Sequence, residues 1–330
     1  MVSIPRGNHN YKYKYCKFEV DPPIATFTIS NPDLRNSYYM KTHEGLENAV
    51  QVVRERDDIR VLILTGDPAG KTFCAGASVK SMAKRAAPDK DVPGLKAYGM
   101  TEEYDPQTKW AQMQRDKGAL LMSDVPPDAP NEAYSRWKWW IESDLRGGYF
   151  QLRQTCLMQL PKPVIAMVNG MGAWGAGADL ALHCDMIVMS DQASFTWNYV
   201  YRTVVPLEGA CFFLPKLVGY HRAMELIMTG RPLKAREAYD WGIVNYVVPE
   251  AELKDFTTNL AHKVAESAPP MNMAVNKYVI QIAQDDWIHK LERIRDELLR
   301  PLTGWFIGSD DMKEAQMAFV QKRKPIYKGR

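Results

Sequence analysis

Short apolar runs recur along the chain and alternate with stretches of helical periodicity. The run IATFTI at 24–29 is rich in β-branched and aromatic residues, which is typical of a strand. Residues 38–55 follow with apolar positions at helical spacing, and RVLILTG at 60–66 stops at a glycine, as a buried strand does. The pattern returns in PVIAMVNG at 163–170 and in CDMIVMS at 184–190. Buried runs that alternate with helices predict an α/β fold with a layered core.

Residues 83–145 break this alternation. They are rich in proline, aspartate and aromatic residues, among them Trp110, Trp137 and Trp140. Disordered segments are poor in aromatic residues, so the composition favours an ordered, functional insertion over the core. The alternative is a disordered surface loop.

The last third of the chain carries helical patterns. We predict helices at 232–244, ending at Gly242, and at 250–266 and 271–302. The resulting organisation is a core at 1–250, which contains the insertion, followed by a C-terminal helical region at 251–330.

The composition, 46% apolar and 25% charged, is that of an ordinary globular protein, and the net charge of +3 is too small to indicate a nucleic-acid partner. Five scattered cysteines without a CxxC pair argue against a disulfide framework and a structural zinc site. His183 and His221 lack partners at metal-ligand spacing, so no metal site is expected. The first 15 residues lack the apolar core of a signal peptide, and no apolar run could span a bilayer. We therefore expect a cytoplasmic protein without a membrane partner.

Two segments rich in small residues carry the candidate chemistry. KTFCAGASVKSM at 71–82 and NGMGAWGAGADLALHCD at 169–185 each follow a predicted strand, where backbone N–H groups are free to bind an oxygen. A phosphate-binding loop is disfavoured, because GxxxxGK[ST] is absent and the GxGxxG at 170–175 lacks an acidic residue about 20 positions on. The simpler alternative is a glycine-rich turn that only packs a helix on a sheet.

These two segments, with LPKLVGYHRAMELIMTGRPLKAREAYDWGIVNYVVP and the ending DDMKEAQMAFVQKRKPIYKG, resemble the crotonase superfamily of enoyl-CoA hydratases and isomerases. The resemblance runs from about Phe18 to the C-terminus, apart from the insertion at 83–145. It implies a crotonase-like core, a ββα superhelix, with a C-terminal helical region for trimerisation. It also implies self-association as a trimer or a dimer of trimers. The substrate would be an acyl-CoA thioester, with coenzyme A as part of the substrate and no separate cofactor.

The resemblance implies that the N–H groups of Ala77 and Ala176 form an oxyanion hole. Family members hold the thioester oxygen between two backbone donors, and losing one donor of a comparable site costs roughly 3–4 kcal/mol. The second position is usually glycine in the family, and the turn here is one residue longer. Alanine donates its N–H equally well.

The candidate acid and base residues depart from the family. Hydratases of the family use two glutamates, and the matching positions here hold Asp179 and Tyr199. Asp179 suits general acid or base work, or is only a helix-start acid. A tyrosine with an ordinary pKa near 10 cannot be a base at neutral pH, but it can donate a hydrogen bond or stack on an acyl ring. Glu208 falls near another catalytic position of the family, or caps the helix that follows.

Further residues are candidates for binding coenzyme A or the acyl group. Ala75 is small enough to let a ligand approach the backbone. Trp174 and Trp197 suggest an acyl pocket for a ring, with ordinary core packing as the alternative. The matching positions for coenzyme A are Arg35, Lys71 and Lys80, and, for the coenzyme A of a neighbouring subunit, Phe306 and Lys322.

The leading hypothesis is an acyl-CoA hydratase or lyase that works through a thioester enolate, with a cyclic or aromatic acyl group. The missing second glutamate keeps a ring-opening C–C hydrolase, a decarboxylase and an isomerase open. A non-catalytic CoA-binding scaffold is the alternative from another class.

Overall fold

The computed structural model describes residues 11–13, 15–38, 40–77, 155–206, 208–267, 269–283 and 310–326. The whole of the insertion predicted at 83–145 lies outside these residues, as do Lys80 and Phe306. The chain divides into two compact units, the first made of Met1–Ser78, Leu152–Val200 and Glu208–Glu292, the second of Val79–Gln151, Tyr201–Leu207 and Arg293–Arg330. Across the described ranges, no helix is both long enough and apolar enough to cross a membrane.

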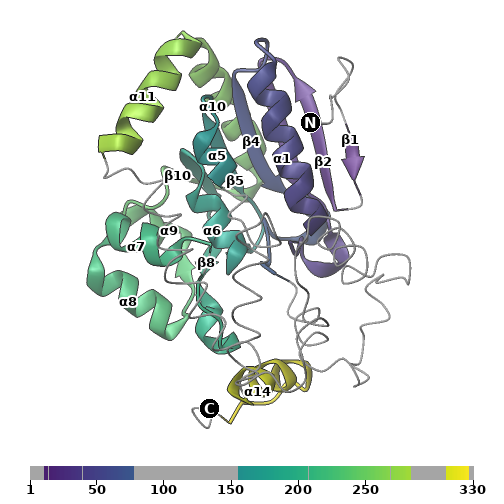
Figure 1. Cartoon of the computed structure of the whole chain (residues 1–330), viewed down its shortest axis with the longest axis vertical. Helices are drawn as coiled ribbons and strands as arrows, with labels where there is room; N and C mark the ends of the chain where they lie inside the picture. The colour runs from purple at the N-terminus through teal and green to yellow at the C-terminus, as the bar shows by residue number, and fades with distance from the viewer. Residues whose placement is uncertain are drawn as a thin grey trace, which may run out of the picture. The chain divides into compact units, whose positions relative to one another are not determined.

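A seven-stranded sheet forms the centre of the first unit (Figure 1). Its order is β1 (Tyr11–Tyr13), β2 (Cys16–Asp21), β3 (Ile24–Ile29), β4 (Val61–Gly66), β5 (Val164–Val168), β7 (Met186–Ser190) and β10 (Tyr246–Val248). The first three strands are antiparallel, and β3 to β10 run parallel. The strands predicted from apolar runs are confirmed as β3, β4, β5 and β7. All six residues of β4 are buried, as a central parallel strand requires.

Helices pack on this sheet. Helix α10 (Leu253–Ser267) contributes Leu253, Ala261 and Ala265 to a buried cluster with Ile63 of β4. Helix α1 (Met40–Glu55) packs on β2 and β3 and lies in front of the sheet in Figure 1. The first unit therefore extends past residue 250, because α10 closes part of its core.

A second sheet was not predicted. It joins β6 (Gly172–Trp174), β8 (Ser194–Thr196) and β9 (Leu233–Lys234). The glycines at 170–177 predicted a single tight turn, which is wrong for 172–174. A Cβ on Gly172 would lie 2.1 Å from the Ser194 carbonyl oxygen, so glycine here serves close strand contact as well as turning.

The helices predicted at 250–266 and 271–302 correspond to α10 and α11, and residues 284–302 lie outside the described residues. The pattern at 232–244 forms β9 and then a shorter helix, and Gly242, at φ 81°, follows its end. The other helices of the described residues are α5 (Thr155–Gln159), α6 (Ala176–Leu182), α7 (Ala210–Val218), α8 (Tyr220–Thr229), α9 (Ala235–Asp240), α11 (Pro270–Ala283) and α14 (Asp310–Val320). Short 3-10 helices lie at η1 (Pro32–Leu34), η2 (Pro68–Gly70), η5 (Asn198–Arg202) and η6 (Glu250–Glu252).

Candidate active site

The first candidate segment runs as extended chain between two neighbours. The Ala75 N–H donates to the Arg35 carbonyl oxygen at 3.1 Å, and the Tyr38 N–H donates to the Gly76 carbonyl oxygen at 2.9 Å. On the other side, the Trp174 N–H donates to the Cys74 carbonyl oxygen at 2.9 Å. The segment that ends at Ala77 is therefore fixed against both the residues before α1 and strand β6.

The two turns that carry Ala77 and Ala176 touch each other. Gly76 has φ 79°, and a Cβ there would lie 2.5 Å from the Trp174 carbonyl oxygen and 3.4 Å from the Ala176 nitrogen. Gly175, at φ 53°, leads into α6, whose first residue is Ala176. In the described part of the chain, neither the Ala77 nor the Ala176 N–H donates a hydrogen bond. Two donors in adjoining turns are what an oxyanion hole requires.

Helix α6 packs closely behind the first turn. A Cβ on Gly177 would lie 2.5 Å from the Cys74 carbonyl oxygen and 2.9 Å from its sulfur. Only glycine permits this approach without a shift of one backbone against the other. The start of α6 is therefore positioned by the segment that carries Ala77.

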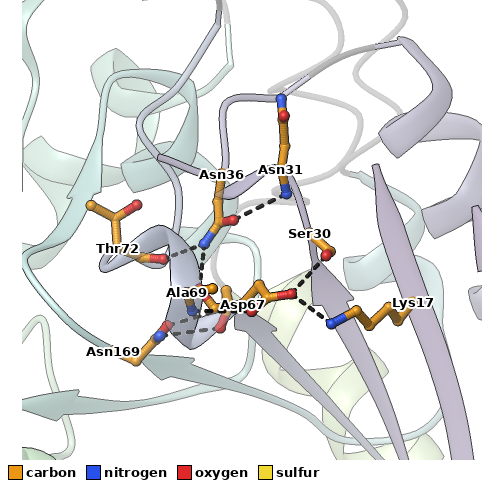
Figure 2. A network of polar contacts seen from close by, with 9 residues as sticks. Lys17, Ser30, Asn31, Asn36, Asp67, Ala69, Thr72 and Asn169 are labelled. Carbon is orange, nitrogen blue, oxygen red and sulfur yellow. Dashed lines mark hydrogen bonds and ion pairs between the residues drawn. The ribbon is translucent and has the colours of Figure 1, made fainter. Parts of the chain in front are cut away.

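Buried asparagines hold the base of both turns (Figure 2). The Asn36 Nδ2 donates to the Asp67 carbonyl oxygen at 2.9 Å and to the Thr72 carbonyl oxygen at 2.6 Å. The Asn36 Oδ1 accepts from the Asn31 N–H at 3.1 Å. Asn36 lies at φ 53°, a left-handed conformation that asparagine tolerates better than most residues.

Asn169 fixes the second turn to the end of β4. Its side-chain amide accepts from the Gly66 N–H at 3.2 Å and donates to the Gly66 carbonyl oxygen at 3.1 Å. Glu250 also accepts from the Gly170 N–H at 2.9 Å. These bonds make the glycine-rich turn a fixed feature of the sheet edge, which preorganised donors need.

Asp67, in the same network, binds Lys17 at 2.6 Å and Ser30 at 2.7 Å (Figure 2). Burial acts to raise the pKa of Asp67, but the hydrogen bonds from Lys17, Ser30 and the Ala69 N–H leave it below its usual value. We read Asp67 as a structural carboxylate.

Asp179 is fully enclosed, with 0% of its surface exposed. Its Oδ1 accepts from the Trp197 indole N–H at 2.9 Å, and its Oδ2 accepts from the Tyr199 hydroxyl at 2.5 Å. Burial raises the pKa of Asp179 to about 7, although the bonds from Tyr199, Trp197 and the Ala210 N–H act to lower it. A carboxyl group with both oxygens occupied is suited to orienting its neighbours.

Tyr199 and Glu208 complete the polar group. Burial, then the charges of Asp179 and Glu208, raise the pKa of Tyr199 well above its usual value, so its hydroxyl keeps its proton. A Cβ on Gly175 would lie 3.9 Å from the Tyr199 ring, which places the tyrosine beside the turn that carries Ala176. Glu208, half-buried, comes just before α7, as the sequence predicted.

His183 supports the same helix. Its Nδ1 lies 2.8 Å from the Asp179 carbonyl oxygen, and its ring packs edge-on against Phe213 with centroids 5.0 Å apart. Burial lowers the pKa of His183 to about 4, so the ring is neutral at pH 7. It is a packed histidine.

The predicted binding residues divide into three groups. Arg35, Lys71, Ala75 and Trp174 gather around the two turns, with the Arg35 guanidinium 5.7 Å from the centre of the Trp174 ring. The prediction that Trp197 lines the acyl pocket is corrected, because Trp197 is 0% exposed and directs its N–H at Asp179. The strand β8 that precedes it carries it into the core. Lys322 is exposed and belongs to the second unit.

Tyr38 was missed by the sequence reasoning. Its backbone pairs with the segment of Ala77, and its buried hydroxyl has no hydrogen-bond partner in the described part of the chain. No motif marks it, because only the bridge between Tyr38 and Ala77 brings it to the site.

The first unit thus has a largely parallel sheet, two adjoining turns with available N–H donors, and a buried acid on the helix that follows. These features define the crotonase fold. A model of the enoyl-CoA hydratase/isomerase family matches residues 19–102 and 135–330, and this chain belongs to that family.

Relatives with established names cover nearly the whole chain. A carnitinyl-CoA dehydratase of Salmonella enteritidis is 31% identical over 309 residues, 93% of this chain and 96% of that protein. The structure of an enoyl-CoA hydratase from Bacillus anthracis is 28% identical, with a TM-score of 0.59, and spans 96% of this chain and all of that one. A carnitinyl-CoA hydratase structure from Mycobacterium avium is 25% identical, with a TM-score of 0.68, over 97% of this chain and 100% of its own.

Proposed function

We propose that this protein is an acyl-CoA hydratase or lyase that holds the thioester oxygen between the N–H groups of Ala77 and Ala176. The observation that carries the proposal is the contact between the two turns, with Gly76 against Trp174 and close to the Ala176 nitrogen. Family membership supports an acyl-CoA substrate, and the named hydratases and dehydratases among the relatives support the reaction type.

The N–H groups would act on the charge that forms during reaction. Adding water to an enoyl thioester forms a C–O bond at the β carbon and moves negative charge onto the thioester oxygen. The α carbon then takes a proton, and loss of water runs the same steps backwards. Donors already fixed in place stabilise that oxygen without rearranging.

We assign the proton-bearing role to Tyr199, with Asp179 as its positioning residue. The sequence alone favoured Asp179 as the acid or base, but its enclosure and its two donors support action through Tyr199. The hydroxyl of Tyr199 can protonate the α carbon of the enolate, and the proton can be replaced from Asp179 across their hydrogen bond. Glu208 remains the candidate base that takes the proton of water, and proton exchange with solvent would then return Glu208 and Asp179 to their starting states.

A second reaction is favoured by the same enclosure of Asp179. Loss of CO₂ or cleavage of a C–C bond also leaves a thioester enolate, and protonating it needs a donor such as Tyr199 but no second glutamate. The acyl group we propose is cyclic or aromatic, because Trp174, half-buried beside the turns, offers a flat apolar face.

A panel of acyl-CoA thioesters separates these reactions. Crotonyl-CoA, a cyclic enoyl-CoA, a ring-dienoyl-CoA and a ketocyclohexanoyl-CoA would be incubated in ¹⁸O-labelled water, and the products followed by mass spectrometry. Hydration predicts one labelled oxygen in an unbroken acyl skeleton. A ring-opened product would replace hydration with cleavage of a C–C bond, and tight binding without turnover of any substrate would indicate a scaffold.

A further inference from the structure

Tyr38 lies at the candidate site but has no role in the proposed chemistry. Its N–H donates to the Gly76 carbonyl oxygen at 2.9 Å, and its Cα pairs with Ala77 in a parallel bridge. Tyr38 therefore lies beside Ala77, the residue whose N–H would bind the thioester oxygen. Tyr38 is 6% exposed.

Among the residues that the structure describes, the Tyr38 hydroxyl has no hydrogen-bond partner. Buried polar atoms in native proteins are nearly always paired, and an unpaired one costs about 1–3 kcal/mol. The ring itself is well held, because His43 packs edge-on against it with ring centroids 4.0 Å apart. A fixed ring with an unpaired hydroxyl is the state expected of a group whose partner arrives with a ligand.

The surroundings of this hydroxyl define the chemistry of that partner. Burial, and next the charge of Glu208, raise the pKa of Tyr38 well above its usual value, so the group is a proton donor at neutral pH. Glu208 acts on Tyr199 in the same way, which places its carboxylate within electrostatic range of both hydroxyls. A hydroxyl or carbonyl oxygen could accept from this buried donor without bringing a further charge into the site, whereas burying a charged group is costly.

We propose that Tyr38 determines specificity by donating a hydrogen bond to a neutral oxygen on the acyl group, beyond the β carbon. This inference rests on the proposed function, because it takes the N–H of neighbouring Ala77 to hold the thioester. The preferred substrate would then be an oxygenated acyl-CoA, bearing a hydroxyl or a carbonyl. A plain hydrocarbon acyl group would leave the Tyr38 hydroxyl unpaired.

Matched thioester pairs test this proposal. Enoyl-CoA substrates with and without a hydroxyl at successive carbons from C4 onward would be compared on the wild type, Tyr38→Phe and Tyr220→Phe. Tyr220 lies on α8, is 65% exposed, and serves as the control. We expect the wild type to prefer one hydroxylated member, and Tyr38→Phe to lower kcat/KM for that member about tenfold or more while leaving its plain partner unchanged.

Folding should not obscure the result, because Tyr38→Phe removes a buried unpaired hydroxyl and should leave the melting temperature equal or higher. An equal loss on both members of each pair would overturn the proposal and make Tyr38 a structural residue. So would a wild type with no preference for an added oxygen.

Calorimetry with saturated, non-reacting thioester pairs separates this inference from the proposed function. Binding with the hydroxyl preference, but without turnover of the reactive substrates, would contradict the proposed reaction and keep the role of Tyr38. Turnover with no hydroxyl preference would do the reverse, and absence of binding by every thioester would overturn both.

Discussion

Buried Tyr38 and half-buried Tyr199 flank the candidate site, and their hydroxyl groups differ in what they touch. The Tyr199 hydroxyl donates to Asp179 at 2.5 Å, whereas the Tyr38 hydroxyl has no hydrogen-bond partner among the described residues. The difference assigns them different tasks, because a hydroxyl tied to a carboxyl group can pass a proton, and an unpaired one can only offer a hydrogen bond. Both tasks depend on residues that are distant in sequence.

Replacing Tyr199 with phenylalanine should remove the proton donor while keeping the ring. We expect kcat to fall about 100-fold or more with little change in KM, since general acid catalysis contributes roughly 10²–10⁴-fold. Steady-state kinetics on the best substrate of the panel would measure it, with Tyr220→Phe as the control. An unchanged kcat would remove Tyr199 from the chemistry.

For single residues, the sequence predicted where a residue lies along an element but not which side chains it contacts. The spacing in GAGAD placed Asp179 at the start of a helix, which the structure bears out. The bonds from Trp197 and Tyr199 could not be predicted, because β8 and η5 bring these residues back against α6. Burial of Asp179 and Trp197 is likewise a property of the assembled layers.

Among the elements, the two turns and the strands that lead to them decide the site geometry. Continuous apolar runs made the buried strands predictable, since such runs are typical of parallel strands covered on both faces. Strand β6 was not predictable, because Gly172 and the glycines on either side of the strand also suit a turn. The close approach of Ser194 to Gly172 makes this segment a strand and not a turn, and that approach is a tertiary contact.

Gly76→Ala should displace one turn from the other. The new Cβ would lie 2.5 Å from the Trp174 carbonyl oxygen, so the backbone that carries Ala77 must move. We expect a loss of about 1–3 kcal/mol in the free energy of unfolding beyond the left-handed backbone strain, and a fall in kcat/KM of at least tenfold.

Gly242→Ala is the matched control for this change. Gly242 has φ 81° against 79° for Gly76, and a Cβ on Gly242 would meet no atom of the described residues within 4 Å. It should lose only the left-handed strain of about 1–2 kcal/mol and keep full activity. Urea unfolding and kinetics measure both variants, and equal losses of activity would contradict the role of the turn contact.

For the whole molecule, the site carries two buried groups with opposite effects on stability. Asp179 has a pKa raised from 3.8 to about 7, so its contribution to folding is present at low pH and lost as pH rises from about 4 to 7. His183 has a pKa lowered from 6.5 to about 4, so its contribution is present above pH 6.5 and lost as pH falls toward 4. Between pH 4 and 6.5 the effects of Asp179 and His183 on the free energy of unfolding change in opposite directions with pH and partly cancel.

Asp179→Asn should remove the pH dependence that Asp179 contributes and leave the one that His183 contributes. The free energy of unfolding of the wild type minus that of the variant should fall by on the order of 4 kcal/mol between pH 4 and 8, with little change above pH 8. Urea titrations followed by circular dichroism would measure it at several pH values. A constant difference would mean that Asp179 stays ionised throughout.

Self-association remains a proposal at this scale, and α11 offers a surface for it. Met271, Val275, Tyr278 and Val279 are 79%, 53%, 64% and 54% exposed and share one face of the helix by their spacing. Val275→Glu should shift the protein toward smaller species in sedimentation velocity, and Asn276→Glu, also exposed, should not. Equal behaviour of both variants and the wild type would exclude this face from an interface.

The central claim is that Ala77 and Ala176 polarise a thioester carbonyl. Infrared difference spectroscopy of a bound acyl-CoA with a ¹³C-labelled thioester carbonyl tests it most directly, because two hydrogen bonds weaken the C=O bond. The account predicts that the labelled band moves to lower wavenumber on binding to the wild type and moves much less in Gly76→Ala. A band at the same wavenumber for free and fully bound thioester would contradict it.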